Sequence, residues 1–372
     1  MILKNCDFYE FMERLGDKKI ICFARGFQLN SMIYMYDYLW EDKIKYIVDN
    51  DTLLCNAVER VKQYEFSLRC PDVLKEEKSD EIVVVIFSMR FYEILSQLDE
   101  IKELDDAEVY IFPLMQTYTL MDKGSFRQSQ NIALIPKKIH YCWFGGMPLS
   151  ESAKQCIKSW KKYCPDYEIV QWDESNYDYK KHPYMKEAYE CKAYAYVSDY
   201  ARLDILYENG GIYMDVDVEV KRNLDPLLYN KAYCGFSSHV PRIATGLGFG
   251  AIKNFHMLKE MMDIYKYERF IETKGINDTF CQVYNTKVLR HYGLIENGRY
   301  QVIEGMACYP KDYFDAMSSY FYIAPRDEKA FSIHGSENTW SDKYSIGFKQ
   351  LKNEAKSYFE ILQERIEKGG KI

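Results

Sequence analysis

The hydrophobic pattern of the first 118 residues alternates between two kinds of stretch. Short, almost wholly apolar runs, such as residues 82–87, are typical of strands buried in a parallel sheet. Longer runs with apolar residues three or four positions apart indicate helices. This alternation predicts a small Rossmann-like α/β unit over residues 1–118. The predicted strands cover residues 19–23, 44–48, 82–87 and 109–112, and the predicted helices cover residues 28–39 and 91–104.

The turn after the first predicted strand bears on whether this unit binds a dinucleotide. Its sequence, CFARGFQLN, contains a single glycine, Gly26. A backbone that closely approaches a pyrophosphate needs several glycines in this turn. We therefore predict a support or assembly domain rather than a dinucleotide-binding one.

Polar residues without a regular period follow, which predicts a linker over residues 119–131. The pattern of strands and helices then returns and predicts a second α/β domain over residues 132–347. The end of the chain, residues 348–372, reads as a charged amphipathic helix. In the second domain the predicted strands include residues 139–144 and 167–172, and the predicted helices include residues 150–163 and 185–194.

The centre of the second domain is predicted to be a helix followed by a strand. Ser198 has the character of a helix N-cap, and Gly210 can take the positive backbone angle that ends a helix. Asp199 and Arg202 are three residues apart and therefore share a helix face. Two interpretations stay open for this pair: a local ion pair, or a pair that binds the hydroxyl groups of a sugar.

The strand after this helix carries two carboxylates, Asp215 and Asp217. The two-residue period of a strand places both on one face. Two oxygen ligands at the end of a strand can hold Mg²⁺ or Mn²⁺ when a phosphate supplies further oxygens. This predicts a nucleotide-diphosphate site, and the alternative is a solvated acidic turn.

Composition narrows the class of partner. The 372 residues are 47% hydrophobic, enough for two cores, and the net charge of −7 without a long basic run argues against nucleic acid. The eleven cysteines are scattered without metal-like spacing, and no long apolar run marks a membrane span. We therefore expect reduced thiols in a cytoplasmic protein, with peripheral contact at the inner membrane face left open.

Three stretches of the second domain carry a resemblance to a known family. They are IPKKIHYCWFGG, SWKKYCPDYEIVQWDE and AYVSDYARLDILYENGGIYMDVDVEV. In order and spacing they resemble the DXD-containing sugar transferases of glycosyltransferase family 32, which include capsular-polysaccharide transferases and mannosyltransferases. The large glucosylating bacterial toxins are more remotely similar. The resemblance implies a GT-A fold and a divalent metal ion, usually Mn²⁺ with Mg²⁺ as the alternative.

The resemblance also implies roles for individual residues. Trp143 matches the tryptophan that stacks on the nucleotide base. Asp199 and Arg202 match the pair that binds hydroxyls of the donor sugar. Asp215 and Asp217 match the DXD motif, in which the second carboxylate binds the metal directly and the first reaches it through water or holds the ribose and sugar.

Two further stretches resemble the family. Residues 243–250, IATGLGFG, match its small-residue loop near the donor sugar and place Thr245 and Gly246 there, although Ala244 replaces a usual asparagine. For Asn277 and Asp278, in a polar stretch, acceptor contacts and a capping role both stay open.

FSIHGSENTW resembles the family's terminal motif, in which a histidine is followed six residues later by tryptophan. It implies that His334 contacts the metal or diphosphate and that Trp340 closes over the diphosphate. Gly335 and Thr339 depart from the usual histidine and serine, so Glu337 stands as an alternative oxygen ligand.

The resemblance implies a metal-dependent, retaining hexosyltransferase. The expected donor is a nucleotide-diphosphate sugar, UDP-linked rather than GDP-linked, and the expected acceptor is a glycan or lipid-linked glycan in surface or capsular polysaccharide synthesis. A homo-oligomer is compatible with the sequence. The alternatives are a non-catalytic sugar-nucleotide sensor or scaffold, and a sugar-nucleotide phosphohydrolase.

Overall fold

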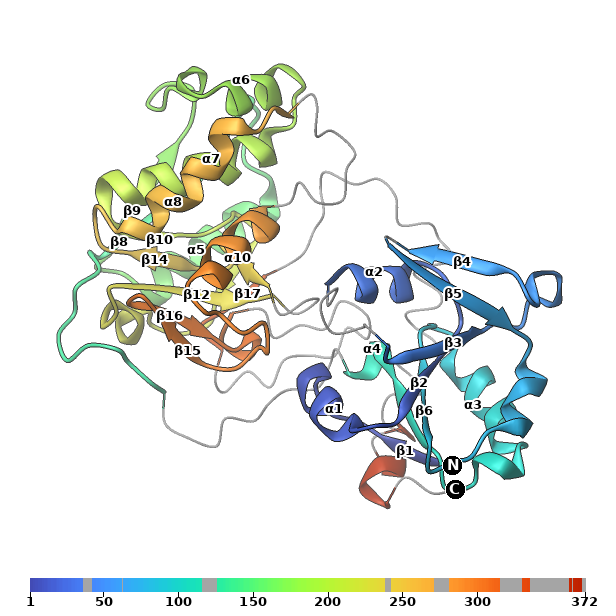
Figure 1. The fold of residues 1–372 in the computed structure, drawn as a ribbon. Helices are drawn as coiled ribbons and strands as arrows, with labels where there is room; N and C mark the ends of the chain where they lie inside the picture. The colour runs from blue at the N-terminus through green and yellow to red at the C-terminus, as the bar shows by residue number, and fades with distance from the viewer. Residues whose placement is uncertain are drawn as a thin grey trace. The chain divides into compact units, whose positions relative to one another are not determined.

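The computed structural model divides the chain into two compact units. Figure 1 shows them as separate α/β bodies. The first contains residues 1–115 together with residues 361–369, and the second contains residues 126–314 together with residues 330–334. The residues that the structure describes are 1–35, 42–61, 63–115, 126–237, 242–270, 281–314, 330–334, 361–362 and 364–369.

The first unit is built on a seven-stranded sheet in the order β1-β7-β6-β2-β3-β5-β4. Neighbouring strands are parallel except for the antiparallel pair β4 and β5. The chain runs outward from β2 in both directions, which is the order of a Rossmann-like sheet. The strands are β1 (Ile2–Lys4), β2 (Lys19–Phe23), β3 (Ile44–Val48), β4 (Val58–Val61), β5 (Tyr64–Arg69), β6 (Ile82–Ile86) and β7 (Glu108–Ile111).

Helices accompany this sheet as the alternating pattern predicts. They are α1 (Phe8–Leu15), α2 (Phe27–Met35), α3 (Phe91–Asp99) and the short α4 (Phe112–Met115). The central strand β6 is buried at every position, which explains its continuous run of apolar residues. The predicted Rossmann-like α/β unit is confirmed, whereas β1 and the hairpin β4–β5 were not predicted.

The turn between β2 and α2 lies where the strand order reverses. Gly26 has a φ of +121° there, a conformation that favours glycine. The backbone N–H of Arg25 donates to Oδ2 of Asp49, at the end of β3, over 3.0 Å. The chain's own carboxylate therefore occupies one backbone amide of this turn, and the role of the unit stays a prediction.

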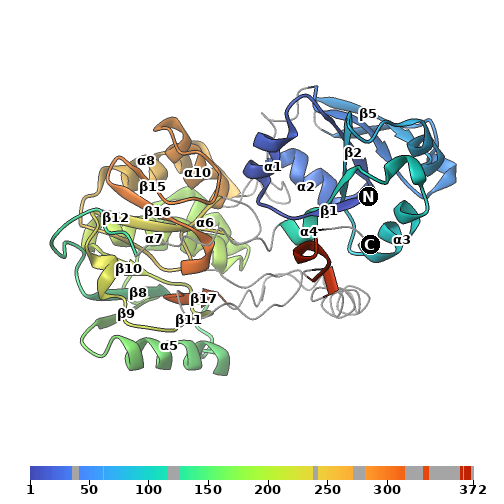
Figure 2. The ribbon, with the colours of Figure 1, turned by 90° about the horizontal axis from the view of Figure 1, so that it is seen from below.

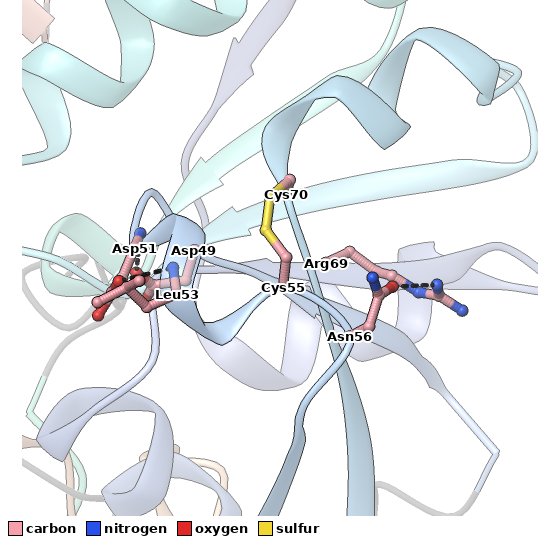
Figure 3. The surroundings of a disulfide bond; sticks show 7 residues. All are labelled: Asp49, Asp51, Leu53, Cys55, Asn56, Arg69 and Cys70. Atoms are coloured by element: carbon pink, nitrogen blue, oxygen red, sulfur yellow. Dashed lines mark hydrogen bonds between the residues drawn. A yellow bond between two sulfur atoms is a disulfide. The ribbon is translucent and has the colours of Figure 1, made fainter.

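A disulfide in the first unit contradicts the expectation that all eleven cysteines are reduced. Cys55 and Cys70 are bonded, with Cα atoms 5.4 Å apart, and the other nine cysteines are free. Figure 3 shows the bond between the turn before β4 and the residue after β5. The antiparallel pairing of β4 with β5 brings these two ends together, so a separation of 15 residues in sequence becomes a contact in space.

The described part of the C-terminal tail belongs to the first unit. Residues 361–362 and 364–367 are helical, in agreement with the predicted helix, whereas residues 348–360 lie outside the described part. Leu362 is buried in the core of the first unit, and Arg365 Nη2 lies 3.2 Å from Asp99 Oδ1.

The second unit has a larger mixed sheet in the order β15-β16-β12-β14-β10-β8-β9, with β13 paired to β12. Figure 2 shows α5 on one side of this sheet and α8 and α10 on the other. The strands are β8 (Lys138–Cys142), β9 (Glu168–Trp172), β10 (Gly211–Tyr213), β12 (Ala232–Phe236), β13 (Ile243–Ala244), β14 (Phe249–Ala251), β15 (Gln301–Ile303) and β16 (Met306–Tyr309). The helices are α5 (Glu151–Tyr163), α6 (Pro183–Glu190), α7 (Tyr194–Asn209), α8 (His256–Ile264) and α10 (Cys281–His291).

Two apolar cores fill the spaces on either side of this sheet. One packs α6, α7, α8 and α10 against it, and the other packs α5 against it. A separate antiparallel pair joins β11 (Val218–Val220) to β17 (Ser332–His334). This three-layer arrangement confirms the α/β class expected for the second domain. Within the described residues, no helix combines the length and the apolar character needed to cross a membrane.

The buried His140, on β8, forms hydrogen bonds with β9 and with the residue that follows α7. The indole Nε1–H of Trp172, on β9, donates to Nδ1 of His140, on β8, over 3.1 Å. His140 Nε2 lies 3.0 Å from the carbonyl oxygen of Gly210. Because that carbonyl can only accept, the ring carries its proton on Nε2 and is neutral. Burial lowers the pKa of His140 from its ordinary 6.5 to about 4.

We expect this histidine to make the second unit less stable in mild acid. Between pH 6.5 and 4 the unfolded chain binds a proton that the folded chain does not, so the free energy of unfolding decreases as the pH falls. The loss between pH 7 and pH 5 is up to about 2 kcal/mol. Urea unfolding, followed by tryptophan fluorescence at both pH values, should show this loss in the wild type and a smaller one in His140→Gln. Equal losses in the two proteins would contradict the assignment.

Candidate functional site

Helix α7 carries the predicted pair Asp199 and Arg202 at the centre of the second unit. The helix begins at Tyr194, so the predicted start at Ser198 is wrong. Ser198 does not cap the helix because its hydroxyl donates to the carbonyl of Ala195, within the first turn. Arg202 Nη2 lies 3.0 Å from Asp199 Oδ1, which confirms that the two side chains meet.

Asp215 joins this pair from the end of β10. Arg202 Nη2 also lies 3.3 Å from Asp215 Oδ1, and the hydroxyl of Tyr213 donates to the same oxygen over 3.0 Å. The guanidinium stacks over the ring of Tyr213, 4.9 Å from its centroid. One arginine therefore bridges two carboxylates, which no local sequence pattern predicts.

Burial changes the pKa values of the charged groups in this cluster. The Arg202 side chain is 5% exposed, against 13% for Asp199 and 29% for Asp215. Burial raises the pKa of Asp199 to about 6, although the charge of Arg202 lowers it. Burial also disfavours the charged guanidinium, but Asp215 and Asp199 outweigh that effect and hold the pKa of Arg202 above its ordinary value. The cluster thus keeps a permanent cation between two acids.

The two carboxylates of the Asp-x-Asp motif do not share a strand face, contrary to the prediction. β10 ends at Tyr213 and β11 begins at Val218, so Asp215 and Asp217 lie in the turn between them. The turn sends the two side chains to different partners: Asp215 contacts Arg202, whereas Asp217 contacts His334. The period of a strand cannot be applied across a turn.

Residues Thr245 and Gly246 lie directly beside Asp215. The backbone N–H of Asp215 donates to the carbonyl of Gly246 over 2.9 Å. A Cβ added at Gly246 would lie 1.9 Å from Asp215 Oδ2, so only glycine allows this approach. The hydroxyl oxygen of Thr245 accepts from the side-chain amide of Asn285, on α10, over 3.0 Å.

A short strand pair brings His334 to the Asp-x-Asp motif. β17 pairs antiparallel with β11, and His334 is opposite Val218. His334 Nε2 lies 3.3 Å from Asp217 Oδ1, and both side chains are about one quarter exposed. A carboxylate and an imidazole that open to solvent together are suitable ligands for a divalent ion.

Within the described residues, no group of three or more His, Cys, Asp and Glu side chains is close enough to hold a metal ion. Asp217 and His334 therefore offer part of a coordination shell, and further ligands must come from elsewhere. Four candidate site residues lie outside the described residues: Asn277, Asp278, Glu337 and Trp340. The two positions that depart from the family motif, Gly335 and Thr339, lie outside them as well.

Trp143 lies at the same edge of the sheet as Asp215. β8 and β10 are parallel, with His140 opposite Tyr213, so the residues that follow both strands emerge on one side. The indole N–H of Trp143 donates to the carbonyl of Met147, and the ring is partly exposed. The following turn contains Gly145, where an added Cβ would overlap the ring of Tyr194, at the start of α7.

Sequence reasoning missed three residues of this site. Tyr213 lies two residues before Asp215, and this spacing was a usable signal. The thiol of Cys281 lowers the pKa of Asp199, and the side-chain amide of Asn285 donates to Thr245. Both come from α10, and nothing in the local sequence connects that helix with the motif.

Comparisons with known proteins agree with the predicted resemblance. Residues 150–233 match the family described as the glycosyltransferase sugar-binding region containing a DXD motif. The chain is 37% identical over 131 residues to inositol phosphoceramide mannosyltransferase 3 of Schizosaccharomyces pombe, which covers 32% of this chain and 36% of the relative. It is 33% identical over 108 residues to a mannosyl phosphorylinositol ceramide synthase of Saccharomyces cerevisiae, covering 27% of each. The chain thus spans about a third of these relatives.

Among solved structures, the chain is similar to the PaToxG glycosyltransferase. The two share 19% identity and a TM-score of 0.33, over 42% of this chain and 68% of that one. A similarity of this size carries no information on substrate or mechanism. The resemblance to DXD-containing sugar transferases is confirmed for residues 150–233, which contain Asp199, Arg202, Asp215 and Asp217.

Proposed function

We propose that this protein transfers a hexose from a nucleotide-diphosphate sugar to a glycan or lipid-linked glycan. Its residues 150–233 match the sugar-binding region of the DXD-containing glycosyltransferases. The observation that carries this proposal is the buried cluster in which Arg202 bridges Asp199 and Asp215, inside the matched region and beside Asp217. An isolated surface ion pair would not be buried or shared in this way.

The donor is held by groups along one edge of the sheet. The exposed part of the Trp143 ring stacks on the base, because the flat face of an indole suits a nucleobase. Asp199 accepts hydrogen bonds from sugar hydroxyls while Arg202 fixes its orientation. The absence of a Cβ at Gly246 lets the Asp215 carboxylate lie against this loop, where it faces Arg202.

Asp217 and His334 bind a divalent ion together with the diphosphate of the donor. The mixed oxygen and nitrogen ligands favour Mn²⁺ over Mg²⁺, which prefers oxygen. When bound, the ion neutralises the negative charge that develops on the leaving diphosphate. Arg202, which stays cationic, stabilises the neighbouring carboxylates so that they do not repel the incoming donor.

Transfer proceeds with retention of the anomeric configuration, by attack of the acceptor on the side from which the diphosphate departs. UDP is the expected nucleotide. The names of the two relatives refer to mannosyl groups, so nucleotide-linked mannose is included among the donors to test. The acceptor belongs to surface or capsular polysaccharide synthesis, as the family resemblance implies.

Calorimetry with a panel of UDP- and GDP-sugars, with and without Mn²⁺, tests this proposal first. We expect one nucleotide to bind only with the metal, and the matching sugar to be transferred to glycan acceptors in a product assay. Release of free sugar at a rate that no acceptor changes would instead identify a phosphohydrolase. Metal-dependent binding without turnover across the acceptors would identify a sensor or scaffold.

A further inference from the structure

Helix α10 reaches the site through two side chains on one face. Cys281 and Asn285 are four residues apart, so they lie one above the other on the helix. The Cys281 thiol lowers the pKa of the Asp199 carboxylate, whose charged form it favours. Asn285 Nδ2 donates to Thr245 Oγ1 over 3.0 Å. The same helix therefore influences Asp199 through Cys281 and holds, through Asn285, the loop that contacts Asp215.

The contact made by Asn285 continues to Asp215 through the backbone. Thr245 precedes Gly246, whose carbonyl accepts the N–H of Asp215 over 2.9 Å. The missing Cβ of Gly246 lets the Asp215 carboxylate rest against this loop. A second anchor lies next to the first, where the backbone N–H of Ile243 donates to Thr286 Oγ1 over 2.9 Å. Movement of the loop would therefore move the carboxylate.

Burial shows that Asn285 cannot act by touching a substrate. The residue is 0% exposed and Thr245 is 1% exposed. Within the described residues, Asn285 Oδ1 has no hydrogen-bond partner. A buried amide with an unpaired oxygen is unfavourable, and leucine has a similar shape without this penalty. The contribution of the amide is therefore its bond to Thr245.

We propose that Asn285 is a positioning residue, which fixes the Asp215 carboxylate against Arg202 through Thr245 and Gly246. This inference rests on the proposed transferase function for its kinetic consequence. Its structural consequence, a rigid Asp215 amide, is independent of that function. A displacement of about 1 Å at a reacting group can lower turnover about 10²-fold.

Asn285→Leu in the full chain tests the proposal, with Val288→Ala as the matched control. Val288 is buried on the same helix, 7% exposed, but does not contact Thr245 through a hydrogen bond. We expect hydrogen exchange at the Asp215 amide to rise at least about tenfold in Asn285→Leu and not in the control, because the bond to Gly246 loosens. We also expect kcat to fall about 10–100-fold with little change in the donor KM.

Thr245→Val and the double variant complete the experiment. If the two side chains act as one unit, the double variant loses no more activity than either single variant. Unchanged exchange at Asp215 in Asn285→Leu would overturn the inference whether or not the wild type transfers sugar. Increased exchange with kcat within twofold of the wild type would overturn it as well. A wild type without transfer rejects the proposed function, and the exchange measurement still decides the role of Asn285.

Discussion

Sugar transfer by Asp217→Ala is expected to fall about 10³-fold or more, because the variant loses a carboxylate that we propose as a ligand of the divalent ion. The nucleotide should also lose the metal-dependent part of its affinity, since His334 alone remains of the pair. The fold should persist, because the Asp217 side chain is 22% exposed and lies in a turn. Turnover and calorimetry with and without Mn²⁺ measure both effects.

Glu219→Ala is the control for this variant. Glu219 lies two residues away on β11, with its side chain 52% exposed and paired to Lys221. Removing this exposed carboxylate should leave transfer and metal dependence unchanged, since exposed ion pairs contribute little. Equal activity in Asp217→Ala and Glu219→Ala would show that the motif does not bind the metal.

Arg202→Met is expected to remove activity and to destabilise the second unit by about 3–5 kcal/mol. The variant leaves Asp199 and Asp215 facing each other without the cation that both contact. Methionine preserves much of the volume, so the loss reports the missing charge rather than a cavity. Chemical unfolding, with separate probes for the two units, measures the change in stability.

Arg365→Met provides the comparison. Arg365 contacts the carboxylate of Asp99 over 3.2 Å in the first unit, and its side chain is 16% exposed, against 5% for Arg202. We expect a loss of at most about 1 kcal/mol and full transfer activity. A similar small loss in Arg202→Met would mean that the guanidinium is not needed to hold the two acids.

The sequence by itself determined the features that depend on near neighbours. Apolar runs such as residues 82–87 identified buried strands, because burial on both faces leaves no room for polar residues. The spacing of Asp199 and Arg202 identified a shared helix face, and the family motifs identified the DXD segment before any coordinates. Each of these signals comes from residues within a single helix, strand or motif, so it can be read without knowing how the elements pack.

Contacts between residues far apart in the sequence were determined only by the tertiary structure. Strand pairing of β11 with β17 places His334 beside Asp217, although 117 positions separate them in the sequence. Packing of α10 against the loop after β13 gives Asn285 its contact with Thr245. The hairpin β4–β5 joins Cys55 to Cys70, against the expectation of reduced thiols.

The turn after β10 shows the physical limit most clearly. A two-residue period predicted Asp215 and Asp217 on one face, but the backbone leaves the strand at Met214 and sends them apart. Contacts with Arg202 on α7, with the hydroxyl of Tyr213 and with the carbonyl of Gly246 fix where Asp215 points. Sequence thus indicated which carboxylates belong to the candidate site, and packing between elements far apart in the chain determined what each carboxylate contacts.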